Sequence, residues 1–227
     1  MLNSMLNSLS PYIGRRAIRK NVGAFLRCRS VEDYSSDERR EIWPAAKELS
    51  TKYIKNCRMV QNRVALLEHI PKCGKCAEIG VMYGDFSQEI LRATTPEKLH
   101  LIDVHRPSIE GAKTRFASEM ACGQVKVHLG DSSAIVSEFP ESSLDWIYID
   151  GDHAYEGVKR DLEASRHAVK PDGLIVLNDY QYFSIVEFMK YGVIEAVNEF
   201  CLKYDWEIIY FALQGRMYND VMLRRIQ

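Results

Sequence analysis

The sequence predicts an α/β fold: a doubly wound, mostly parallel sheet of seven strands, with an antiparallel C-terminal edge hairpin and N-terminal helices. A length of 227 residues and a hydrophobic content of 46% are enough to bury the core of one such domain. From Lys75 onward, short apolar runs alternate with amphipathic stretches. Because strands that alternate with helices are joined by right-handed crossovers, this alternation predicts a parallel sheet with helices on both faces.

The elements of this fold follow in order along the chain. Five apolar runs are expected to form the parallel strands: residues 75–80, 98–104, 124–130, 144–150 and 173–179. Amphipathic stretches are expected to form the helices: residues 86–93, 108–120, 132–138, 154–169 and 183–203. Residues 205–213 and 215–226 read as two closing strands around Gln214-Gly215, which is a hairpin signal. Ligands of such sheets bind at the carboxyl ends of the strands.

The chain is expected to have two parts, an N-terminal helical extension (residues 1–58) and the main domain (residues 59–227). Three further helices are expected near the start: residues 12–27, residues 36–56 (interrupted by Pro44) and residues 59–70. Residues 1–30 carry six basic residues and no acidic one, and a helix over residues 12–27 would set most of them opposite a broad apolar face. This segment is expected to act as a lid or as a contact in a homo-oligomer, with a membrane-surface contact as the weaker alternative.

Composition excludes several classes of partner. The 30 basic and 31 acidic residues nearly cancel, so no nucleic-acid partner is expected. No apolar stretch approaches the roughly 20 residues that span a bilayer, and the N-terminus lacks the apolar core of a signal peptide. Together with six scattered cysteines, this predicts a cytoplasmic protein. Cys73 and Cys76 form a single CGKC motif without a second ligand pair, so they read as two thiols leading into a strand.

Glycine and acidic residues follow the first three strands of the predicted sheet. The first strand runs into AEIGVMYGDFS, in which Gly80 and Gly84 allow a sharp turn and a close backbone approach to a ligand. Their spacing is not that of the dinucleotide fingerprint. Asp103 ends the second strand, where sheets of this kind hold a ribose. Asp131 and Ser132 follow the third strand and either contact a base or, for Asp131, only cap the next helix.

These motifs, together with LDWIYIDGDHAYEGVKRDLEAS and VKPDGLIVLNDY, resemble class I S-adenosylmethionine-dependent methyltransferases of Rossmann-like fold. More narrowly, they resemble the branch of macrocin-type and other antibiotic-sugar O-methyltransferases, over about residues 59 to 224. The resemblance implies S-adenosylmethionine as cofactor. It assigns the cofactor site as follows: Gly80 and Gly84 at the methionine portion, Asp103 at the ribose hydroxyls, Asp131 and Ser132 at the adenine, and Glu78 beneath the loop.

Three oxygen-bearing side chains follow the fourth and fifth strands. Asp150 ends one strand, while Asn178 and Asp179 end its expected neighbour. Because such strand ends lie side by side, these residues are expected to converge, and hard oxygen ligands suit Mg²⁺ or Mn²⁺. Related sugar O-methyltransferases have a similar pattern, but they commonly carry an aspartate at both of the positions that match Asn178 and Asp179. Asn178 therefore removes one negative charge from the expected metal site.

The remaining residues of the cluster are candidates for the catalytic base. Methyl transfer to a hydroxyl requires that a base accept the proton, and Asp152 or His153 directly follows the first expected ligand. The sequence does not separate the two, although an ordinary histidine has the more suitable pKa. Alternatively, both residues only cap the helix that starts near Ala154.

These observations predict an S-adenosylmethionine-dependent O-methyltransferase that acts on a small-molecule acceptor with the help of a divalent metal. The acceptor is expected to be a hydroxyl of a sugar or a glycosylated metabolite. One alternative is a metal-independent small-molecule methyltransferase. Another is a non-catalytic adenosyl-binding partner subunit, which the ionisable groups retained at the strand ends argue against.

Overall fold

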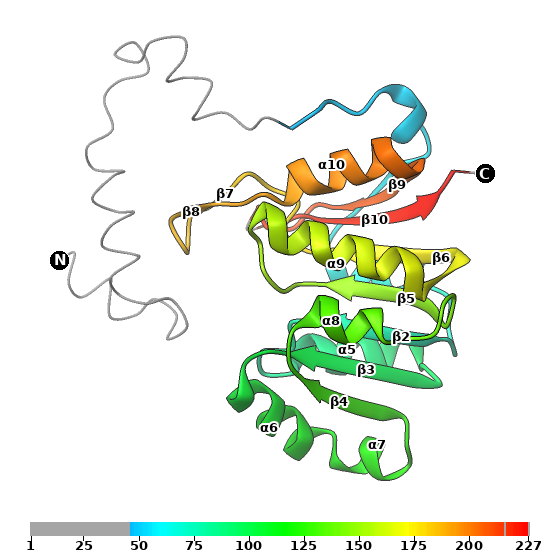
Figure 1. Cartoon of the computed structure of the whole chain (residues 1–227), viewed down its shortest axis with the longest axis vertical. Helices are drawn as coiled ribbons and strands as arrows, with labels where there is room; N and C mark the ends of the chain where they lie inside the picture. Colours follow the sequence, from blue (N-terminus) through cyan, green and yellow to red (C-terminus); the bar gives the residue numbers. More distant parts are fainter. Residues whose placement is uncertain (1–45, 216, 227) are drawn as a thin grey trace, which may run out of the picture.

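The computed structural model describes residues 46–215 and 217–226 and is built around one eight-stranded sheet (Figure 1). In spatial order the strands are β1 (Arg58–Val60), β9 (Trp206–Ala212), β10 (Asp220–Arg225), β6 (Val169–Leu177), β5 (Leu144–Ile149), β2 (Lys75–Ile79), β3 (Lys98–Asp103) and β4 (Val125–Leu129). β10 runs antiparallel to both of its neighbours, and the other pairs are parallel. The predicted class of fold, α/β with a mostly parallel sheet and a C-terminal antiparallel hairpin, is confirmed.

Helices cover both faces of the sheet (Figure 1). One face carries α4 (Arg63–Leu67), α5 (Asp85–Thr94) and α6 (Arg106–Arg115), which continues into α7 (Ala117–Ala121). The other face carries α8 (Ser132–Ser137), α9 (Tyr155–Ala168) and α10 (Val193–Tyr204). The sheet therefore has a hydrophobic core on each face. Side chains of a strand point alternately to the two faces, so in β5 Trp146 and Tyr148 pack in the core beneath α4, α5 and α6, while Ile147 and Ile149 pack in the core beneath α8, α9 and α10.

Part of the N-terminal region differs from the prediction. Residues 59–70 were expected to form one helix, but Arg58–Val60 forms β1 and pairs with β9 as an eighth strand. Asn62 then caps α4 by accepting a hydrogen bond from the backbone N–H of Ala65. Of the expected helix 36–56, the described part holds only the 3₁₀ turn η2 (Thr51–Tyr53). The boundary expected after residue 58 therefore falls inside β1, and the expected helix 12–27 lies outside the described residues.

The expected helix 183–203 is also corrected. Its first part forms a small hairpin of β7 (Phe183–Ser184) and β8 (Met189–Lys190), and α10 begins only after Gly192. A Cβ at Gly192 would lie 2.3 Å from the backbone nitrogen of Tyr155, so this glycine lets the chain pass close to the start of α9. Short apolar runs do not by themselves distinguish strand from helix, which explains the error.

The register of the central strands aligns the residues that follow them. Ile79 of β2 pairs with Ile149 of β5, and Ile149 pairs with Leu177 of β6. The next residues of these strands, Gly80 and Asp150, are therefore neighbours, and Asn178 follows in line. The sheet thus brings its glycine loop and its acidic residues to one edge.

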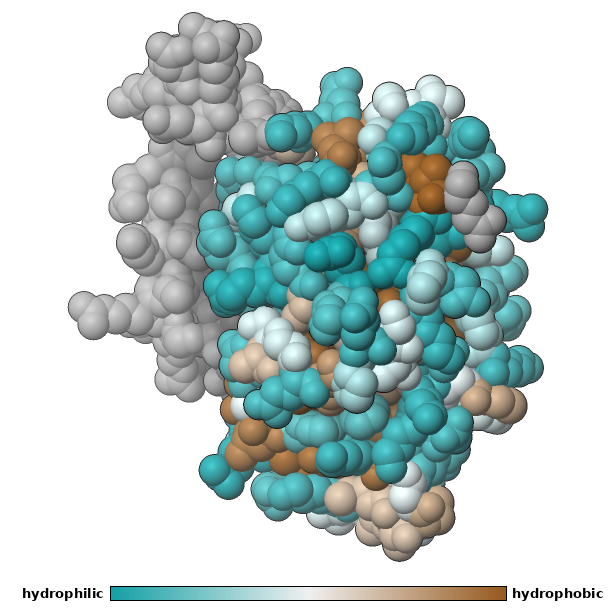
Figure 2. Space-filling view, turned by 45° about the vertical axis from the view of Figure 1, so that its right-hand side comes forward, coloured by the Kyte–Doolittle hydropathy of each residue, from teal (hydrophilic) through white to brown (hydrophobic). Residues whose placement is uncertain are grey.

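Hydrophilic residues predominate on the face shown in Figure 2, and hydrophobic residues form small separate groups there. Within the described part of the chain, none of the helices combines the length and the apolar character that crossing a membrane requires.

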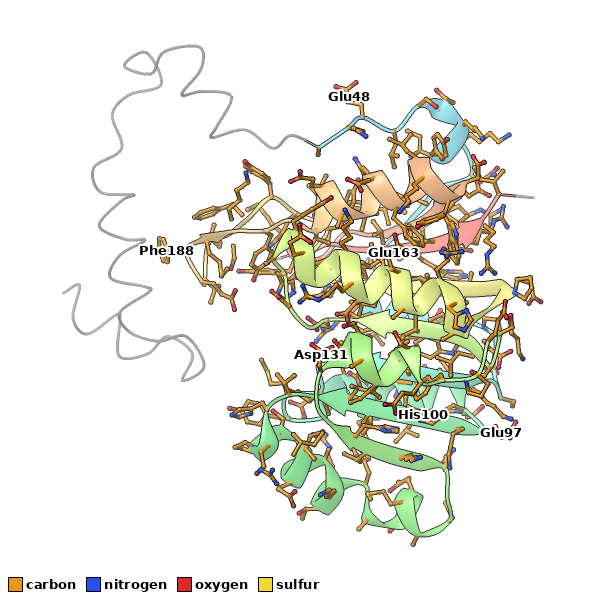
Figure 3. The ribbon with its side chains drawn as sticks, in the orientation of Figure 1. Glu48, Glu97, His100, Asp131, Glu163 and Phe188 are labelled. Atoms are coloured by element: carbon orange, nitrogen blue, oxygen red, sulfur yellow. The ribbon has the colours of Figure 1, made fainter. Side chains whose placement is uncertain are left out.

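A histidine pair inside the fold predicts acid sensitivity. His100 of β3, labelled in Figure 3, lies 2.9 Å (Nδ1 to Nε2) from His128 of β4. Burial, then the charges of His128, Lys126 and Lys98, lowers the pKa of His100 from 6.5 to about 4. As the pH falls from about 6.5 towards 4, the unfolded chain therefore takes up a proton that folded His100 does not accept, so stability is lost over this window.

We expect His100→Phe to reduce the loss of unfolding free energy between pH 7 and pH 5 by about 1–2 kcal/mol. Urea unfolding at the two pH values measures this difference. His167→Gln, which changes an exposed histidine of α9, serves as the control and should leave the pH dependence unchanged. Equal acid sensitivity in the parent and His100→Phe would contradict the assignment.

Candidate active site

A cavity of about 1240 Å³ lies at the carboxyl edge of the parallel strands. All but one of the expected site residues line it: Glu78, Gly80, Asp103, Asp131, Ser132, Asp150, Asp152, His153, Asn178 and Asp179. The exception is Gly84. Exposed apolar side chains, Met82, Val104 and Val186, also border the cavity. The structure therefore gathers residues from five strand ends around one space large enough for two small molecules.

The two glycines of the first loop have different roles in the structure. Gly80 has φ +83°, and a Cβ there would lie 1.8 Å from the backbone carbonyl oxygen of Asp150. Only glycine lets the loop pass this close to the end of β5. Gly84, at φ +75°, precedes α5, and its Cβ would lie 2.9 Å from the ring of Phe116. Gly80 therefore shapes the cavity wall, and Gly84 shapes the turn into α5.

Asp103 holds the glycine loop. Its Oδ2 accepts hydrogen bonds from the backbone N–H groups of Val81 (2.9 Å) and Met82 (3.2 Å), and its Oδ1 accepts one from His105 (2.7 Å). A carboxylate has about four acceptor positions. Asp103 can thus brace the loop and still accept a hydrogen bond from a ligand in the cavity.

Glu78 lies at the base of the same loop. It is only 1% exposed and accepts a hydrogen bond from the hydroxyl of Ser87 in α5. Burial raises the pKa of Glu78 to about 8. The residue therefore links β2 to α5 beneath the loop.

The residues after β4 cap a helix and form a polar pair. The Asp131 carboxylate accepts hydrogen bonds from the hydroxyl of Ser133 (2.6 Å) and the backbone N–H of Ala134 (2.9 Å) at the start of α8 (Figure 3). These hydrogen bonds, that of Ser133 first, lower the pKa of Asp131. Ser132 donates to Asp161 (2.6 Å), a buried residue of α9 whose pKa is raised to about 6 by burial. The capping alternative for Asp131 is therefore observed, and the residue still lines the cavity.

Asp150, His153 and Asp179 form the acidic cluster of the site. One ligand atom from each lies within 4.8 Å of the others. His153 Nε2 is 3.2 Å from Asp179 Oδ2 and 3.5 Å from Asp150 Oδ1, and its ring stacks on Tyr191 with centroids 4.4 Å apart. Burial raises the pKa of Asp179 to about 7. Burial alone would lower the pKa of His153, but Asp150 and Asp179 outweigh this effect and raise it.

The donor set of this cluster fits a divalent cation. Among the described residues, Asp179 Oδ1 and His153 Nε2 are buried atoms with no hydrogen-bond partner of regular geometry. Buried polar atoms are rarely left in this state. Two carboxylates and an imidazole are groups that bind divalent metals in proteins. Asp150 and Asp179 are therefore suitable ligands, and His153 is close enough to be a third.

Asn178 contacts Asp220, an acidic residue that was not among the expected site residues. Its Nδ2 donates to Oδ1 of Asp220 (2.9 Å), and Asp220 Oδ2 accepts a hydrogen bond from the hydroxyl of Tyr148 (2.6 Å). Asp220 is fully buried, and burial raises its pKa to about 7. Asn178 is thus held by β10 while it lines the cavity.

The two candidate bases occupy different environments. Asp152 is exposed, and its carboxylate accepts the backbone N–H of Ala154 (2.9 Å) just before α9. His153 lies in the acidic cluster, with its side chain 18% exposed. The geometry therefore gives Asp152 a capping contact and His153 the position beside the carboxylates.

Three functional residues were not predicted from the sequence: Arg63 and Asp161, which line the cavity, and Asp220, which is buried behind it and contacts Asn178. Arg63 Nη1 lies 3.5 Å from Asp150 Oδ2, and its guanidinium lies 4.4 Å from the ring centroid of Phe86. Asp161 had a usable signal, because it interrupts the apolar face of a predicted helix between Val158 and Leu162. Arg63 and Asp220 lie far from the motifs in sequence and had no such signal.

This fold, with a glycine loop and acidic residues at successive strand ends, is the Rossmann-like methyltransferase fold, as predicted. Residues 77–180 match a family model described as "Methyltransferase domain". Together with the fold, this match confirms the prediction of an enzyme of the methyltransferase type. Comparison with curated proteins gave no match.

Three solved structures illustrate the similarity in fold. A SAM-dependent methyltransferase from Aquifex aeolicus has 14% identity and a TM-score of 0.54, over 71% of this chain and 87% of that one. The B. subtilis M1A22 tRNA methyltransferase TrmK has 13% identity and a TM-score of 0.55, over 74% and 67%. M. capricolum TrmK, in complex with S-adenosyl-homocysteine, has 11% identity and a TM-score of 0.55, over 75% and 70%. At these identities the comparison establishes the fold.

Proposed function

We propose that this protein is an S-adenosylmethionine-dependent O-methyltransferase that uses a divalent metal. Its proposed acceptor is a hydroxyl of a small molecule, a sugar or a glycosylated metabolite. The observation that carries this proposal is the convergence of Asp150, His153 and Asp179 within 4.8 Å, in a cavity that the glycine loop also lines. The resemblance of the IDGDHAYEGV motif to sugar O-methyltransferases supports the class of acceptor.

The proposed cofactor site follows the strand ends. Gly80 and its loop border the methionine portion, Asp103 accepts the ribose hydroxyls, and Asp131 and Ser132 lie at the adenine end. S-adenosylmethionine, when bound, supplies the methyl group from its sulfonium. Arg63 is the best placed cation for the methionine carboxylate, because it lines the cavity between Phe86 and Asp150.

The proposed metal ligands are Asp150 and Asp179, with Asn178 Oδ1 as a neutral ligand. Mg²⁺ or Mn²⁺, when bound, would lower the pKa of the acceptor hydroxyl and fix its orientation. His153 is the proposed base, because its Nε2 already lies beside both carboxylates. Asp152 is the alternative base, and its exposed position makes it the weaker candidate.

A metal-independent methyltransferase is the second candidate. The observation in its favour is that His153 contacts both Asp150 and Asp179 and has a raised pKa, so a protonated imidazole, together with Arg63 beside Asp150, would balance the two carboxylates. In that case the cluster needs no cation to be electrically stable. Metal removal distinguishes the two candidates.

A small-molecule acceptor is proposed in preference to a nucleic acid. The net charge of −1 provides no general attraction for phosphate, and the cavity is lined by several carboxylates. The five described cysteines are free, which is consistent with the proposed cytoplasmic location. The proposed lid or homo-oligomer contact of residues 1–30 lies outside the described residues.

Transfer of a labelled methyl group from S-adenosylmethionine tests the function. The acceptors to compare are sugar nucleotides, glycosides, catechols and lipid-linked saccharides. We expect methylation of a hydroxyl in at least one sugar-containing group. Calorimetry should show binding of S-adenosylhomocysteine and none of NAD. Tight NAD binding without a response to the adenosyl compound would contradict the cofactor assignment.

We expect Arg63→Met to weaken S-adenosylhomocysteine binding about 10- to 100-fold, because hydrogen bonds to a charged group contribute about 1.5–3 kcal/mol. Arg63→Lys should recover part of this loss by restoring the charge without the forked geometry. Calorimetry on the two variants measures the effect. Arg92→Met, at an exposed arginine of α5 that pairs with Glu89, is the matched control and should bind like the parent. Parent-like affinity in Arg63→Met would exclude the proposed carboxylate contact.

A further inference from the structure

Asp220 is a buried carboxylate with three hydrogen-bond donors. The hydroxyl of Tyr148 donates to Oδ2 (2.6 Å), while Asn178 Nδ2 (2.9 Å) and Gln214 Nε2 (2.7 Å) both donate to Oδ1. These donors come from β5, from the end of β6 and from the segment between β9 and β10. With an exposed fraction of 0%, the carboxylate has no access to solvent and depends on them.

The sheet register explains why Asp220 meets Asn178. β10 is antiparallel to β6, and Val221 pairs with Leu177, so the residue before Val221 lies opposite the residue after Leu177. Asp220 accepts from all three of its neighbours, and the amide nitrogen of Asn178 is the atom that faces it. The oxygen of the same amide is then the atom directed away from Asp220. Because Asn178 lines the cavity, this orientation makes its oxygen available there.

The same carboxylate anchors a wall of the cavity. Gln214 and Tyr218 both line the cavity and belong to residues 213–219, which connect β9 to β10. The hydroxyl of Tyr218 lies 3.1 Å from Ser184 Oγ and accepts the backbone N–H of Val186 (3.3 Å). Tyr218 is thus joined to the β7–β8 hairpin, and Gln214 is joined to Asp220.

We propose that Asp220 is a positioning residue: it fixes the Asn178 amide with its oxygen toward the cavity and holds Gln214 at the cavity wall. The inference rests on the proposed function, since that oxygen is assigned there as a neutral metal ligand. It also explains why residue 178 is an amide in this chain. An aspartate at 178 would face Asp220 at hydrogen-bond distance, and two ionised carboxylates repel each other there. In the Asn178–Asp220 pair, the negative charge therefore lies on β10, one strand further from the cavity than β6.

A charge-exchange cycle tests this proposal with four proteins: the parent, Asn178→Asp, Asp220→Asn and the double variant. Asn178→Asp creates the repulsive pair, and Asp220→Asn removes the acceptor that orients the amide. In the double variant, the amide at 220 donates to the carboxylate at 178 and still accepts from Tyr148, while the Gln214 amide turns over so that its oxygen faces the new amide nitrogen. The pair then keeps its charge and its complementarity with the direction of the hydrogen bond reversed.

We expect each single variant to lower kcat for methyl transfer about tenfold or more, with the KM for S-adenosylmethionine nearly unchanged, and the double variant to recover at least about tenfold of the combined loss. Mn²⁺ binding, followed by calorimetry, should be weakened in Asp220→Asn and at least parental in the double variant. Glu207→Gln is the matched control. Glu207 is also a buried acid, 3% exposed, but it pairs with Arg224 and Asn56 and does not line the cavity. Its variant should lower Tm without changing Mn²⁺ affinity.

Two outcomes would overturn the positioning role. In one, the loss of kcat and of Mn²⁺ affinity in the double variant equals the product of the losses in the two single variants. In the other, the two substitutions affect each other only in Tm. A parent that binds no Mn²⁺ would contradict the metal part of the proposed function instead. The kcat values of the four proteins would then be sufficient to test the role of Asp220.

Discussion

Gly80→Ala is expected to lower Tm and to weaken S-adenosylhomocysteine binding at least about tenfold. The added Cβ would lie 1.8 Å from the carbonyl oxygen of Asp150, and residue 80 has φ +83°. The left-handed conformation costs a non-glycine residue about 1–2 kcal/mol, and overpacking typically adds about 1–3 kcal/mol. Because the obstacle is backbone, the ends of β2 and β5 must separate. The change therefore displaces the glycine loop and Asp150 together.

Thermal unfolding and calorimetry measure both effects. A destabilisation of this size corresponds to a decrease in Tm of about 5–15 °C for a chain of this length. Gly111→Ala is the matched control, because a Cβ at Gly111 in α6 has no atom within 4 Å. This control should raise stability by about 0.5–1 kcal/mol, since alanine favours helix more than glycine does. Parent-like behaviour of Gly80→Ala would mean that the loop does not form the binding surface.

The strand ends were predictable because each strand has a local signal. Apolar runs end at Gly80, Asp103 and Asp150. Each run therefore marks both a strand and the residue at its carboxyl end. In a parallel sheet these ends lie on one edge, so their convergence in the cavity followed from the order of the elements alone. The split of roles between Gly80 and Gly84 did not follow. It depends on which neighbour, Asp150 or Phe116, approaches each glycine.

Residues that enter the site through long-range pairing were not predictable. Asp220 reaches Asn178 across 42 positions of sequence and Tyr148 across 72, and only the antiparallel register of β10 brings them together. Arg63 reaches Asp150 from a helix that the sequence placed correctly only in part. The β7–β8 hairpin was missed because its apolar residues also fit a helix. Local pattern predicts elements well, but it does not determine which side chains of distant elements meet.

Asp179→Asn is expected to abolish measurable metal dependence and to lower kcat by on the order of 10²–10⁴-fold, because a divalent metal supplies several kcal/mol of charge stabilisation. Asp179 is 5% exposed, and its Oδ1 has no hydrogen-bond partner among the described residues. An amide keeps the shape but loses the charge that attracts the cation. S-adenosylhomocysteine affinity should change little, since the proposed cofactor contacts lie at other strand ends.

Chelation of the parent provides the complementary measurement. An excess of chelator should stop methyl transfer without preventing S-adenosylhomocysteine binding, and added Mg²⁺ or Mn²⁺ should restore turnover. Asp145→Asn is the matched control: Asp145 belongs to the same strand, β5, but pairs with Lys170 and does not line the cavity. It should keep the metal response of the parent. Undiminished turnover of the parent in chelator would exclude metal assistance and favour the metal-independent candidate.

The base is identified by comparing His153→Gln with Asp152→Asn under saturating metal. Loss of the base should lower kcat by about 10²–10⁴-fold while leaving cofactor affinity unchanged. His153 lies 3.2 Å from Asp179 and Asp152 contacts the start of α9, so we expect the large loss in His153→Gln. If His153→Gln also loses Mn²⁺ binding, the histidine is a ligand, and Asp152 becomes the only one of the two still available to take the proton. If neither variant loses activity, the cluster neither binds the metal through His153 nor uses these two residues as base, and Asp152 retains only its capping contact.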